Sequence, residues 1–276
     1  MVKYLIFGKG YLGNKFAQYF KDSVISDQRI NSSSDAEKEI TKHNPEVVIN
    51  CIGRTGTPNV DWCEDHKIET MKGNVTVPLM ILEACQSTGK YMVHIGSGCI
   101  YNGDNGGKGW TEEDEPNFFG SFYSRTKIYS EKMLKEFPVL QLRIRIPMDD
   151  IPHSKNIIDK IIKFEKVIDV DNSITYLPDL MKISEQLIKL RKTGVYNAVN
   201  KGPLRYPYLL DKYKELVDPN KTYETFSLED LHSEVKAKRS NCVLSVSKLE
   251  KAGIKVRPIQ EAVVDCLKKY RINLKK

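Results

Sequence analysis

The chain has 276 residues, and its 43 Lys and Arg against 36 Asp and Glu give a formal net charge of +7. Hydrophobic residues at 40% and charged residues at 29% are ordinary for a globular protein and exclude a fibrous or disordered chain. The basic excess is spread along the chain without a basic stripe interleaved with aromatic residues, so we expect no nucleic-acid partner. Mild basicity fits a small anionic ligand instead.

The six cysteines and the start of the chain bear on the compartment. No Cys-x-x-Cys pair occurs and no His lies at zinc spacing, so the sequence predicts neither a metal site nor a disulfide framework. A first strand that begins within three residues of Met1 leaves no room for a signal or transit peptide, and no apolar stretch approaches the length of a membrane span. We therefore expect a cytoplasmic protein with no membrane partner.

Apolar strands alternate with amphipathic helices through the first half of the chain. Strands are expected at 2–7, 24–26, 47–50, 91–95 and 139–146, and helices from the glycines at 8–13 to Phe20 and at 36–43, 68–88 and 121–136, with a loop at 53–65. This alternation predicts an α/β, Rossmann-like, doubly wound parallel sheet with helices on both faces. Ligands of such sheets bind at the carboxyl ends of strands, where Gly8, Gly53 and Ser97 fall.

Beyond Pro147 the pattern is less regular. Helices are expected around 156–164 and 180–191, a strand at 195–199, and short helices alternating with Lys-rich loops from Pro203 onward. We read these segments as a smaller C-terminal lobe that interleaves with the last strands of the sheet.

The sequence Gly8-Lys9-Gly10-Tyr11-Leu12-Gly13 closes a strand and opens a helix. The amides and dipole of a helix N-terminus in that context face a pyrophosphate. We therefore predict that Gly8, Gly10, Tyr11, Leu12 and Gly13 bind a dinucleotide cofactor.

The choice of cofactor rests on the residues after the second strand. Asp27 would favour a free ribose 2′-hydroxyl, whereas Arg29 could pair with a 2′-phosphate. We predict NADPH bound through Arg29, with NADH as the alternative. The domain prediction is then an NADP(H)-binding domain at 1–147, its sheet completed by about 167–200, and a substrate-binding lobe formed by 148–166 and 201–276.

Four side chains suggest carbonyl chemistry. Ser97 ends a strand, and Tyr123 and Lys127 lie one turn apart on one face of a helix. A free phenol titrates near pH 10, so it needs a nearby cation to donate a proton at neutral pH, and Lys127 would supply that charge. Cys99 adds a soft acid/base that could work on carbon.

The combined pattern is similar to the extended short-chain dehydrogenase/reductase family. Within that family the chain resembles the plant-type bifunctional 3,5-epimerase/4-reductases of UDP-rhamnose synthesis over nearly its whole length. The stretches that carry the resemblance are 50–56, 58–67, 98–101, 112–114, 116–118, 120–124 and 142–147, and Asn59-Val60-Asp61-Trp62-Cys63-Glu64 is the most discriminating.

The resemblance implies the conversion of UDP-4-keto-6-deoxy-D-glucose to UDP-L-rhamnose by a homodimer. Cys99 and Lys160 would be the acid/base residues on carbon, and Tyr123 would protonate the C4 oxygen as hydride arrives from NADPH. It further implies cofactor contacts at Asn50, Gly53, Asn74, Tyr123 and Lys127, and substrate contacts at Asn156, Arg239 and Asn241. Segment 101–108 is shorter and richer in glycine than in the plant pattern, so the resemblance does not predict its path.

Two other functions are compatible with the sequence. A reductase only, similar to the enzyme that finishes dTDP-rhamnose, would not need Cys99. A non-catalytic NADP-binding regulatory subunit would usually have lost the Tyr or the Lys of the Tyr-x-x-x-Lys unit, and this chain keeps both.

Overall fold

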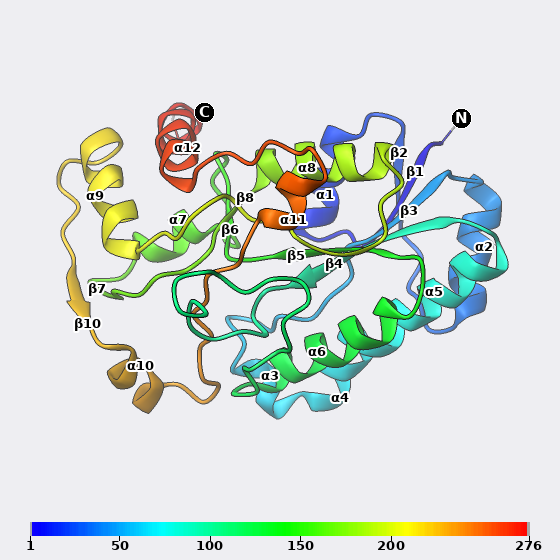
Figure 1. Cartoon of the computed structure of the whole chain (residues 1–276), viewed down its shortest axis with the longest axis horizontal. Helices are drawn as coiled ribbons and strands as arrows, with labels where there is room; N and C mark the ends of the chain where they lie inside the picture. Colours follow the sequence, from blue (N-terminus) through cyan, green and yellow to red (C-terminus); the bar gives the residue numbers. More distant parts are fainter. Residues whose placement is uncertain (1, 275–276) are drawn as a thin grey trace. The chain divides into compact units, whose positions relative to one another are not determined.

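A computed structural model describes residues 2–274 (Figure 1). Strands and helices alternate along the first half of the chain, as the hydrophobic pattern predicts. Up to residue 144 they are β1 Tyr4–Phe7, α1 Tyr11–Tyr19, β2 Ser23–Ser26, α2 Ser33–His43, β3 Val47–Asn50, α3 Trp62–Asp65, α4 Lys67–Met71, a π-helical segment Lys72–Thr76, α5 Val77–Ser87, β4 Tyr91–Ser97, α6 Phe122–Lys135 and β5 Leu140–Ile144. The later elements are β6 Pro147–Met148, α7 Ile157–Ile161, β7 Lys166–Ile168, β8 Thr175–Tyr176, α8 Leu177–Lys189, β9 Gly194–Asn197, α9 Tyr206–Leu216, β10 Glu224–Phe226, α10 Leu228–Glu234, α11 Ser247–Lys251 and α12 Ile259–Asn273.

The described part of the chain divides into two compact units. The first comprises 2–100, Phe118–Arg143 and Leu187–Tyr196, and the second comprises Tyr101–Asn117, Ile144–Gln186 and 197–274. The chain therefore enters the second unit directly after Ile100 and returns to the first at Phe118.

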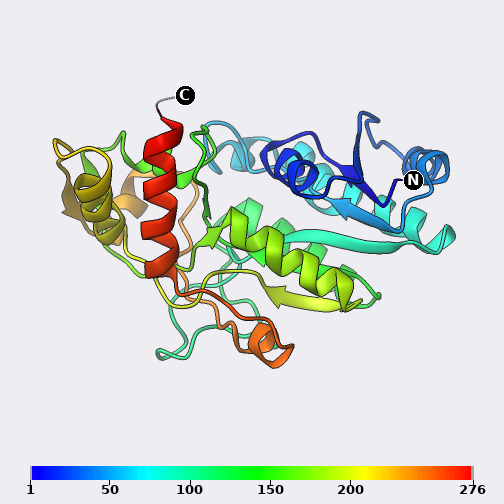
Figure 2. The same ribbon diagram turned by 90° about the horizontal axis from the view of Figure 1, so that it is seen from above.

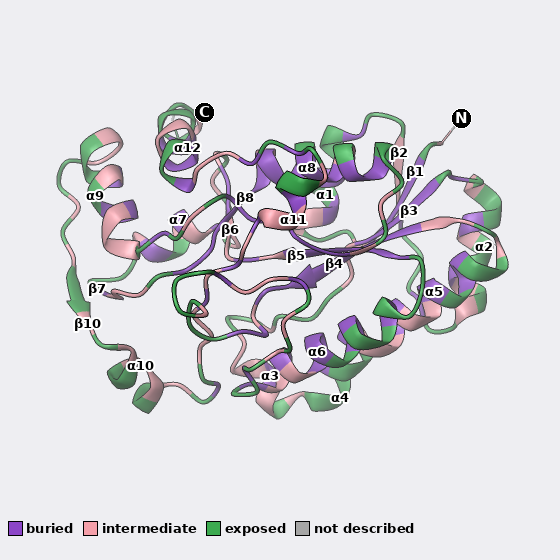
Figure 3. Ribbon diagram, viewed as in Figure 1, coloured by how far each residue is buried: buried purple, intermediate pink, exposed green. Residues whose placement is uncertain are grey.

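The first unit contains a sheet in the order β2-β1-β3-β4-β5-β9. β1 pairs in parallel with β2 and β3, and β3 pairs in parallel with β4, with Asn50 opposite His94 at the end of that last pair. All residues of β1 and β3 are buried (Figure 3), as strands covered on both faces require. The Rossmann-like sheet predicted from the sequence is confirmed.

Helices cover this sheet and bury its apolar side chains. α5 contacts β3 and β4, α6 contacts β4, and α1 contacts β1 and β2. The core beneath α2 and α5 is formed by apolar side chains that include Leu5, Phe7, Ile40, Val48, Ile81 and Met92. The outer faces of these helices are exposed (Figure 3), which is the amphipathic pattern that identified them in the sequence.

The second unit has its own core. Side chains of α7, α9 and α12 pack together, and α12 lies beside α9 (Figures 1 and 2). β7 pairs with β10 and β6 with β8, both in parallel. The expectation of only short helices after Pro203 is wrong, because α12 has 15 residues and buries a continuous stripe. That stripe contains Ile259, Ala262, Val263, Cys266, Leu267 and Tyr270.

Other differences from the predicted elements are local. The helix predicted at 68–88 is interrupted by the π-helical segment Lys72–Thr76, and a short helix, α3, lies inside the loop predicted at 53–65. α7 ends at Ile161, three residues before the predicted end, and Phe164 beyond it is exposed. A helix end is set by packing as much as by propensity, so these boundaries are the least predictable part of the pattern.

Segment 101–117 follows a defined path inside the second unit. Gly103 bridges to Cys242 and Trp110 to Leu244 in parallel fashion. Gly109 adopts φ +73°, and a Cβ there would lie 2.9 Å from the amide nitrogen of Ser245. The glycines that obscured this segment in the sequence let the two backbones approach each other.

Candidate active site

The glycine turn after β1 requires two of its glycines for steric reasons. Gly8 has φ +109°, and a Cβ there would lie 2.9 Å from the carbonyl carbon of Cys51. A Cβ on Gly13 would lie 1.8 Å from the carbonyl oxygen of Gly8. These two positions therefore hold α1 tightly against the ends of β1 and β3.

Gly10 is different, because a Cβ there would meet no heavy atom within 4 Å. It is the N-cap of the nine-residue helix α1 and makes no side-chain cap hydrogen bond, so the amides of Tyr11 and Leu12 lie in the uncapped first turn. Open space beside the amides of a helix N-terminus is what a pyrophosphate needs. The turn therefore fits the predicted dinucleotide.

The residues after β2 carry the charges expected near the adenosine ribose. The Asp27 carboxylate forms an ion pair with the Lys9 ammonium, which comes from inside the glycine turn. Arg29 lies two residues farther on and is exposed. Lys9 was not among the predicted site residues, although a cation between the first two glycines was a readable signal.

Asn50 and His94 join the ends of β3 and β4. Asn50 Nδ2 lies 3.1 Å from His94 Nδ1, and Asn50 Oδ1 accepts a hydrogen bond of 2.9 Å from the amide of Ile52. Burial lowers the pKa of His94 well below its usual value, and the charge of Lys127 lowers it further, so His94 is neutral and accepts from Asn50. Asn50 thus shapes the turn that leads to Gly53, and its contact with a cofactor stays a prediction.

Asn74 lies in the π-helical segment and is buried. Its Oδ1 accepts from the Arg54 amide at 2.7 Å, and its Nδ2 donates to the Arg54 carbonyl at 2.9 Å and to Thr126 Oγ1 at 3.1 Å. A Cβ on Gly53 would lie 3.4 Å from the same Oδ1. The Asn74 amide therefore fastens the Gly53–Arg54 turn to α6, and its contact with a cofactor stays a prediction.

Ser97, Cys99 and Lys127 come together at the carboxyl end of β4. Ser97 is buried, and its Oγ accepts a hydrogen bond of 3.1 Å from the amide of Cys99. Lys127 Nζ donates to the carbonyl oxygen of Ile95 at 3.1 Å, which ties α6 to this strand end. The half-buried Cys99 is also close enough to Lys127 to influence its pKa.

Tyr123 is buried, with 9% of its surface exposed, in the first turn of α6. Ser121 caps this helix by accepting from the Ser124 amide, and Glu64 of α3 accepts from the Phe122 amide. Glu64 belongs to the stretch 59–64, which is the most discriminating part of the family resemblance, but the sequence alone predicted no role for it. Its carboxylate at the helix N-terminus helps to fix the start of the helix that carries Tyr123.

Lys127 is a buried cation, with only 6% of its surface exposed. Burial lowers its pKa to about 8, while the nearby Glu131 and Cys99 act to raise it. A lysine in this range keeps its proton at neutral pH and loses it in mildly alkaline solution. It can therefore hold a positive charge one turn away from Tyr123.

The predicted substrate residues all belong to the second unit. Asn156 is the buried N-cap of α7: its Oδ1 accepts from the amides of Asp149 and Ile158, and its Nδ2 donates to the carbonyls of Asp149 and Ile151. This side chain is occupied by its own loop, and its predicted contact with a substrate is not tested.

Lys160 lies in α7 and is exposed at the surface of the second unit. Partial desolvation and the nearby Lys155 lower its pKa.

The other two predicted substrate residues lie near each other in the chain. Arg239 Nη1 donates to the Ala237 carbonyl, and Asn241 presents a buried Oδ1 with no hydrogen-bond partner. An amide oxygen in that condition is suited to accept from a ligand.

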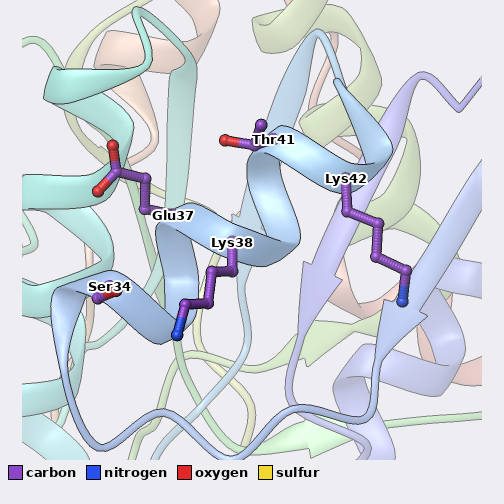
Figure 4. Close-up of a pocket in the computed structure, with 5 residues that line it drawn as sticks. All are labelled: Ser34, Glu37, Lys38, Thr41 and Lys42. Atoms are coloured by element: carbon purple, nitrogen blue, oxygen red, sulfur yellow. The ribbon is translucent and has the colours of Figure 1, made fainter.

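The outward surface of α2 has a shallow hollow lined by Ser34, Glu37, Lys38, Thr41 and Lys42 (Figure 4). All five side chains come from one helix, and none is a predicted site residue. We interpret it as a solvated helix face.

Within residues 2–274, no group of three or more His, Cys, Asp or Glu side chains could hold a metal ion, and no helix is both long and apolar enough to cross a membrane.

Comparison with known proteins adds four findings. The family model described as "RmlD substrate binding domain" matches residues 3–163. A bifunctional dTDP-4-dehydrorhamnose 3,5-epimerase/dTDP-4-dehydrorhamnose reductase of Arabidopsis thaliana is 36% identical over 273 residues, which cover 95% of this chain and 91% of that protein.

Two solved structures resemble the fold. The L780 UDP-rhamnose synthase of Acanthamoeba polyphaga mimivirus superposes with a TM-score of 0.92 at 31% identity, covering 97% of this chain and 99% of that one. A dTDP-4-dehydrorhamnose reductase of Bacillus anthracis, solved in complex with NADP, has a TM-score of 0.83 at 20% identity and covers 99% of each chain.

Proposed function

Because the chain belongs to the RmlD substrate binding domain family, within the extended short-chain dehydrogenase/reductases, we propose that it is a bifunctional 3,5-epimerase and NADPH-dependent 4-keto reductase. Its reaction is the conversion of UDP-4-keto-6-deoxy-D-glucose to UDP-L-rhamnose. The observation that carries this proposal is Cys99, held by its amide to Ser97 and lying within electrostatic reach of the buried Lys127. Relatives that carry both activities in one chain support it.

Epimerisation uses the acidity of the carbons beside the C4 ketone. A base removes the C–H proton, the electron pair moves onto the ketone oxygen, and an acid returns a proton to the opposite face of the same carbon, so no atoms are gained or lost. We assign this work to Cys99 and Lys160. The lowered pKa of Lys160 supports this assignment, because it increases the neutral fraction that can act as a base.

Reduction then acts on the same ketone. Bound NADPH supplies the hydride that reduces C4. Ser97 orients the C4 oxygen, and Tyr123 donates its phenolic proton to that oxygen. Lys127 stabilises the phenolate that remains, because its ammonium is held by the Ile95 carbonyl one helical turn from Tyr123.

The cofactor assignment is supported by the chain's own charges. Lys9 neutralises Asp27, the residue that would repel a 2′-phosphate, and the exposed Arg29 offers a guanidinium two residues away. The Bacillus anthracis reductase with the same fold was solved with NADP. We also propose a reducing, cytoplasmic location, which suits six cysteines that form no disulfide in the described structure.

We propose a homodimer formed through α6. Tyr129 and Met133 lie one turn apart on this helix and are 60% and 52% exposed. Two such apolar side chains on one helix face would be covered by a second copy. Light scattering should give twice the chain mass for the native protein, and the single mass for Tyr129→Glu/Met133→Glu. A native protein that runs as a monomer would contradict this part of the proposal.

One experiment separates the bifunctional enzyme from a reductase. In deuterated water without reductant, the native protein should exchange the hydrogens at C3 and C5 of the keto sugar, as read by NMR. Cys99→Ser should lose this exchange and still oxidise NADPH with a pre-epimerised ketone. If the native protein takes up no deuterium, only the reductase function survives.

Cys51 provides the matched control for that test. It is half-buried after β3, and burial raises the pKa of its thiol, so it should not act as a base. Cys51→Ser should retain both activities. If the native protein oxidises no NADPH with the keto sugar or with the pre-epimerised ketone, the result would instead point to a regulatory subunit.

A further inference from the structure

A buried ion pair lies next to Lys127 in the first unit. Arg143 of β5 donates from Nε to Glu131 Oε2 at 2.7 Å and from Nη2 to Glu131 Oε1 at 2.7 Å. The two side chains are 2% and 9% exposed. A bidentate pair removed from water in this way is costly to build, and an apolar pair of similar volume would often stabilise a core better.

The position of the pair relates it to the reaction. Glu131 follows Lys127 by four residues on α6, so the two side chains share one helix face, and Glu131 acts to raise the pKa of Lys127. Arg143 binds both oxygens of that carboxylate from the neighbouring strand. The order of charges is therefore Lys127, Glu131, Arg143.

Among the described residues, Cys99 and His94 also interact electrostatically with Lys127. His94 of β4 is neutral because burial holds its pKa low, Cys99 follows the same strand, and Tyr123 precedes Lys127 by one turn. Glu64 of α3 reaches the N-terminus of α6, at the amide of Phe122. Among these groups, Glu131 is the acidic side chain on the same helix face as Lys127.

We propose that Glu131 is a positioning residue that keeps Lys127 protonated during catalysis, and that Arg143 is a second positioning residue that holds the Glu131 carboxylate in place and moderates its effect on Lys127. Glu131 supplies negative charge to a desolvated ammonium, and Arg143 fixes that carboxylate and limits its strength, so that Lys127 is not drawn away from the Ile95 carbonyl. The inference rests on the proposed reductase function, because it assigns the pair a task in holding the cation that serves Tyr123.

The test uses the alkaline limb of kcat/KM for NADPH oxidation, where loss of the Lys127 proton ends activity. Glu131→Gln leaves Arg143 as an unopposed cation and should move this limb down by about one pH unit. Arg143→Met should move it up, because Glu131 then attracts Lys127 alone. The double variant Glu131→Gln/Arg143→Met should lie between Glu131→Gln and the native protein.

This order of the alkaline limbs distinguishes an electrostatic effect on Lys127 from simple support of the fold. A loss of fold support would lower kcat/KM at every pH and leave the pH of the limb unchanged. The double variant leaves neither Glu131 nor Arg143 as the unpaired half of a buried ion pair, so it remains informative if Glu131→Gln fails to fold. Glu136→Gln, an exposed change of the same kind at the end of α6, should leave the limb unmoved.

A second readout does not depend on activity. In protein labelled with ¹³C at lysine Cε, the signal that disappears in Lys127→Arg reports the titration of Lys127 directly by NMR. Its midpoint should follow the same order in the three variants. An unchanged midpoint would overturn the positioning role, and it would leave the proposed function standing if the native protein still reduces the keto sugar. A native protein that shows no reduction would overturn the function while the NMR order could still hold.

Discussion

Two lysines, one in each compact unit, carry different tasks in the proposed reaction. Lys127 sits in a 14-residue helix, is buried, and donates to the Ile95 carbonyl. Lys160 sits in a five-residue helix and is exposed beside Lys155. Desolvation lowers the pKa of both. The difference lies in the neighbours: Glu131 supports a charge that must persist, whereas Lys155 promotes the loss of a proton, as a base requires.

The most disruptive test of this contrast removes the acid that Lys127 serves. Tyr123→Phe should reduce NADPH oxidation by roughly 10²–10⁴-fold, because the phenolic proton has no substitute. Deuterium exchange at C3 and C5 should continue, since that step belongs to Cys99 and Lys160. Stopped-flow absorbance and NMR give the two rates separately. Equal loss of both activities would mean that the two tasks are not divided in this way.

The counterpart test removes the second lysine. Lys160→Met should slow deuterium exchange by about 10²-fold, the lower range for a positioned acid or base. Reduction of a pre-epimerised ketone should stay near the native rate. Lys163→Met, an exposed lysine just beyond α7, is the matched control and should affect neither step. Normal exchange by Lys160→Met would remove this residue from the mechanism.

The pH dependence sharpens the comparison further. Lys127 releases its proton as the pH rises through about 8, well below the ordinary 10.5, so reduction should decline above that pH. At pH values well above 8, kcat/KM should fall about tenfold per pH unit, as expected when activity depends on one essential proton. Lys127→Arg, which stays charged, should abolish this limb in whatever activity it retains. Exchange at carbon should not decline over the same range, because Lys160 works as a base.

The smallest effect concerns an exposed cation of the first unit. Arg29→Ala should lower the preference for NADPH over NADH by roughly tenfold, the value of one exposed charge-assisted hydrogen bond. Asp27→Ala should leave Lys9 free for the cofactor and shift the preference the other way. The ratio of kcat/KM values with the two cofactors measures both changes. An unchanged ratio in Arg29→Ala would show that the guanidinium does not contact the cofactor.

The sequence predicted the local structure around the candidate site, because that structure depends on short spacings. The glycines at 8–13 and the Tyr-x-x-x-Lys unit lie within single turns, so strand, turn and helix follow from neighbouring residues. The structure brings Ser97, Cys99 and Lys127 to one strand end, in agreement with the rule for parallel sheets.

Contacts between distant parts of the chain could not be predicted. Glu64 reaches Phe122 across 58 residues, and Asn74 reaches Arg54 across 20. The bridges that hold segment 101–117 against 242–244 also join residues more than a hundred positions apart. No periodicity encodes such pairs, because each depends on how the whole unit packs.

The widened turn at Lys72–Thr76 has a consequence for how this chain tolerates change. A π-helical turn holds one residue more than an α-helical turn, so the stretch behaves as a single-residue insertion within a continuous helix. Removing one residue there would restore a regular helix and rotate Asn74 by about 100° relative to α5, away from the Arg54 backbone. A deletion that makes the helix regular would thus release the Gly53–Arg54 turn. The π-helical geometry at Lys72–Thr76 is therefore needed to keep Asn74 bonded to the Arg54 backbone.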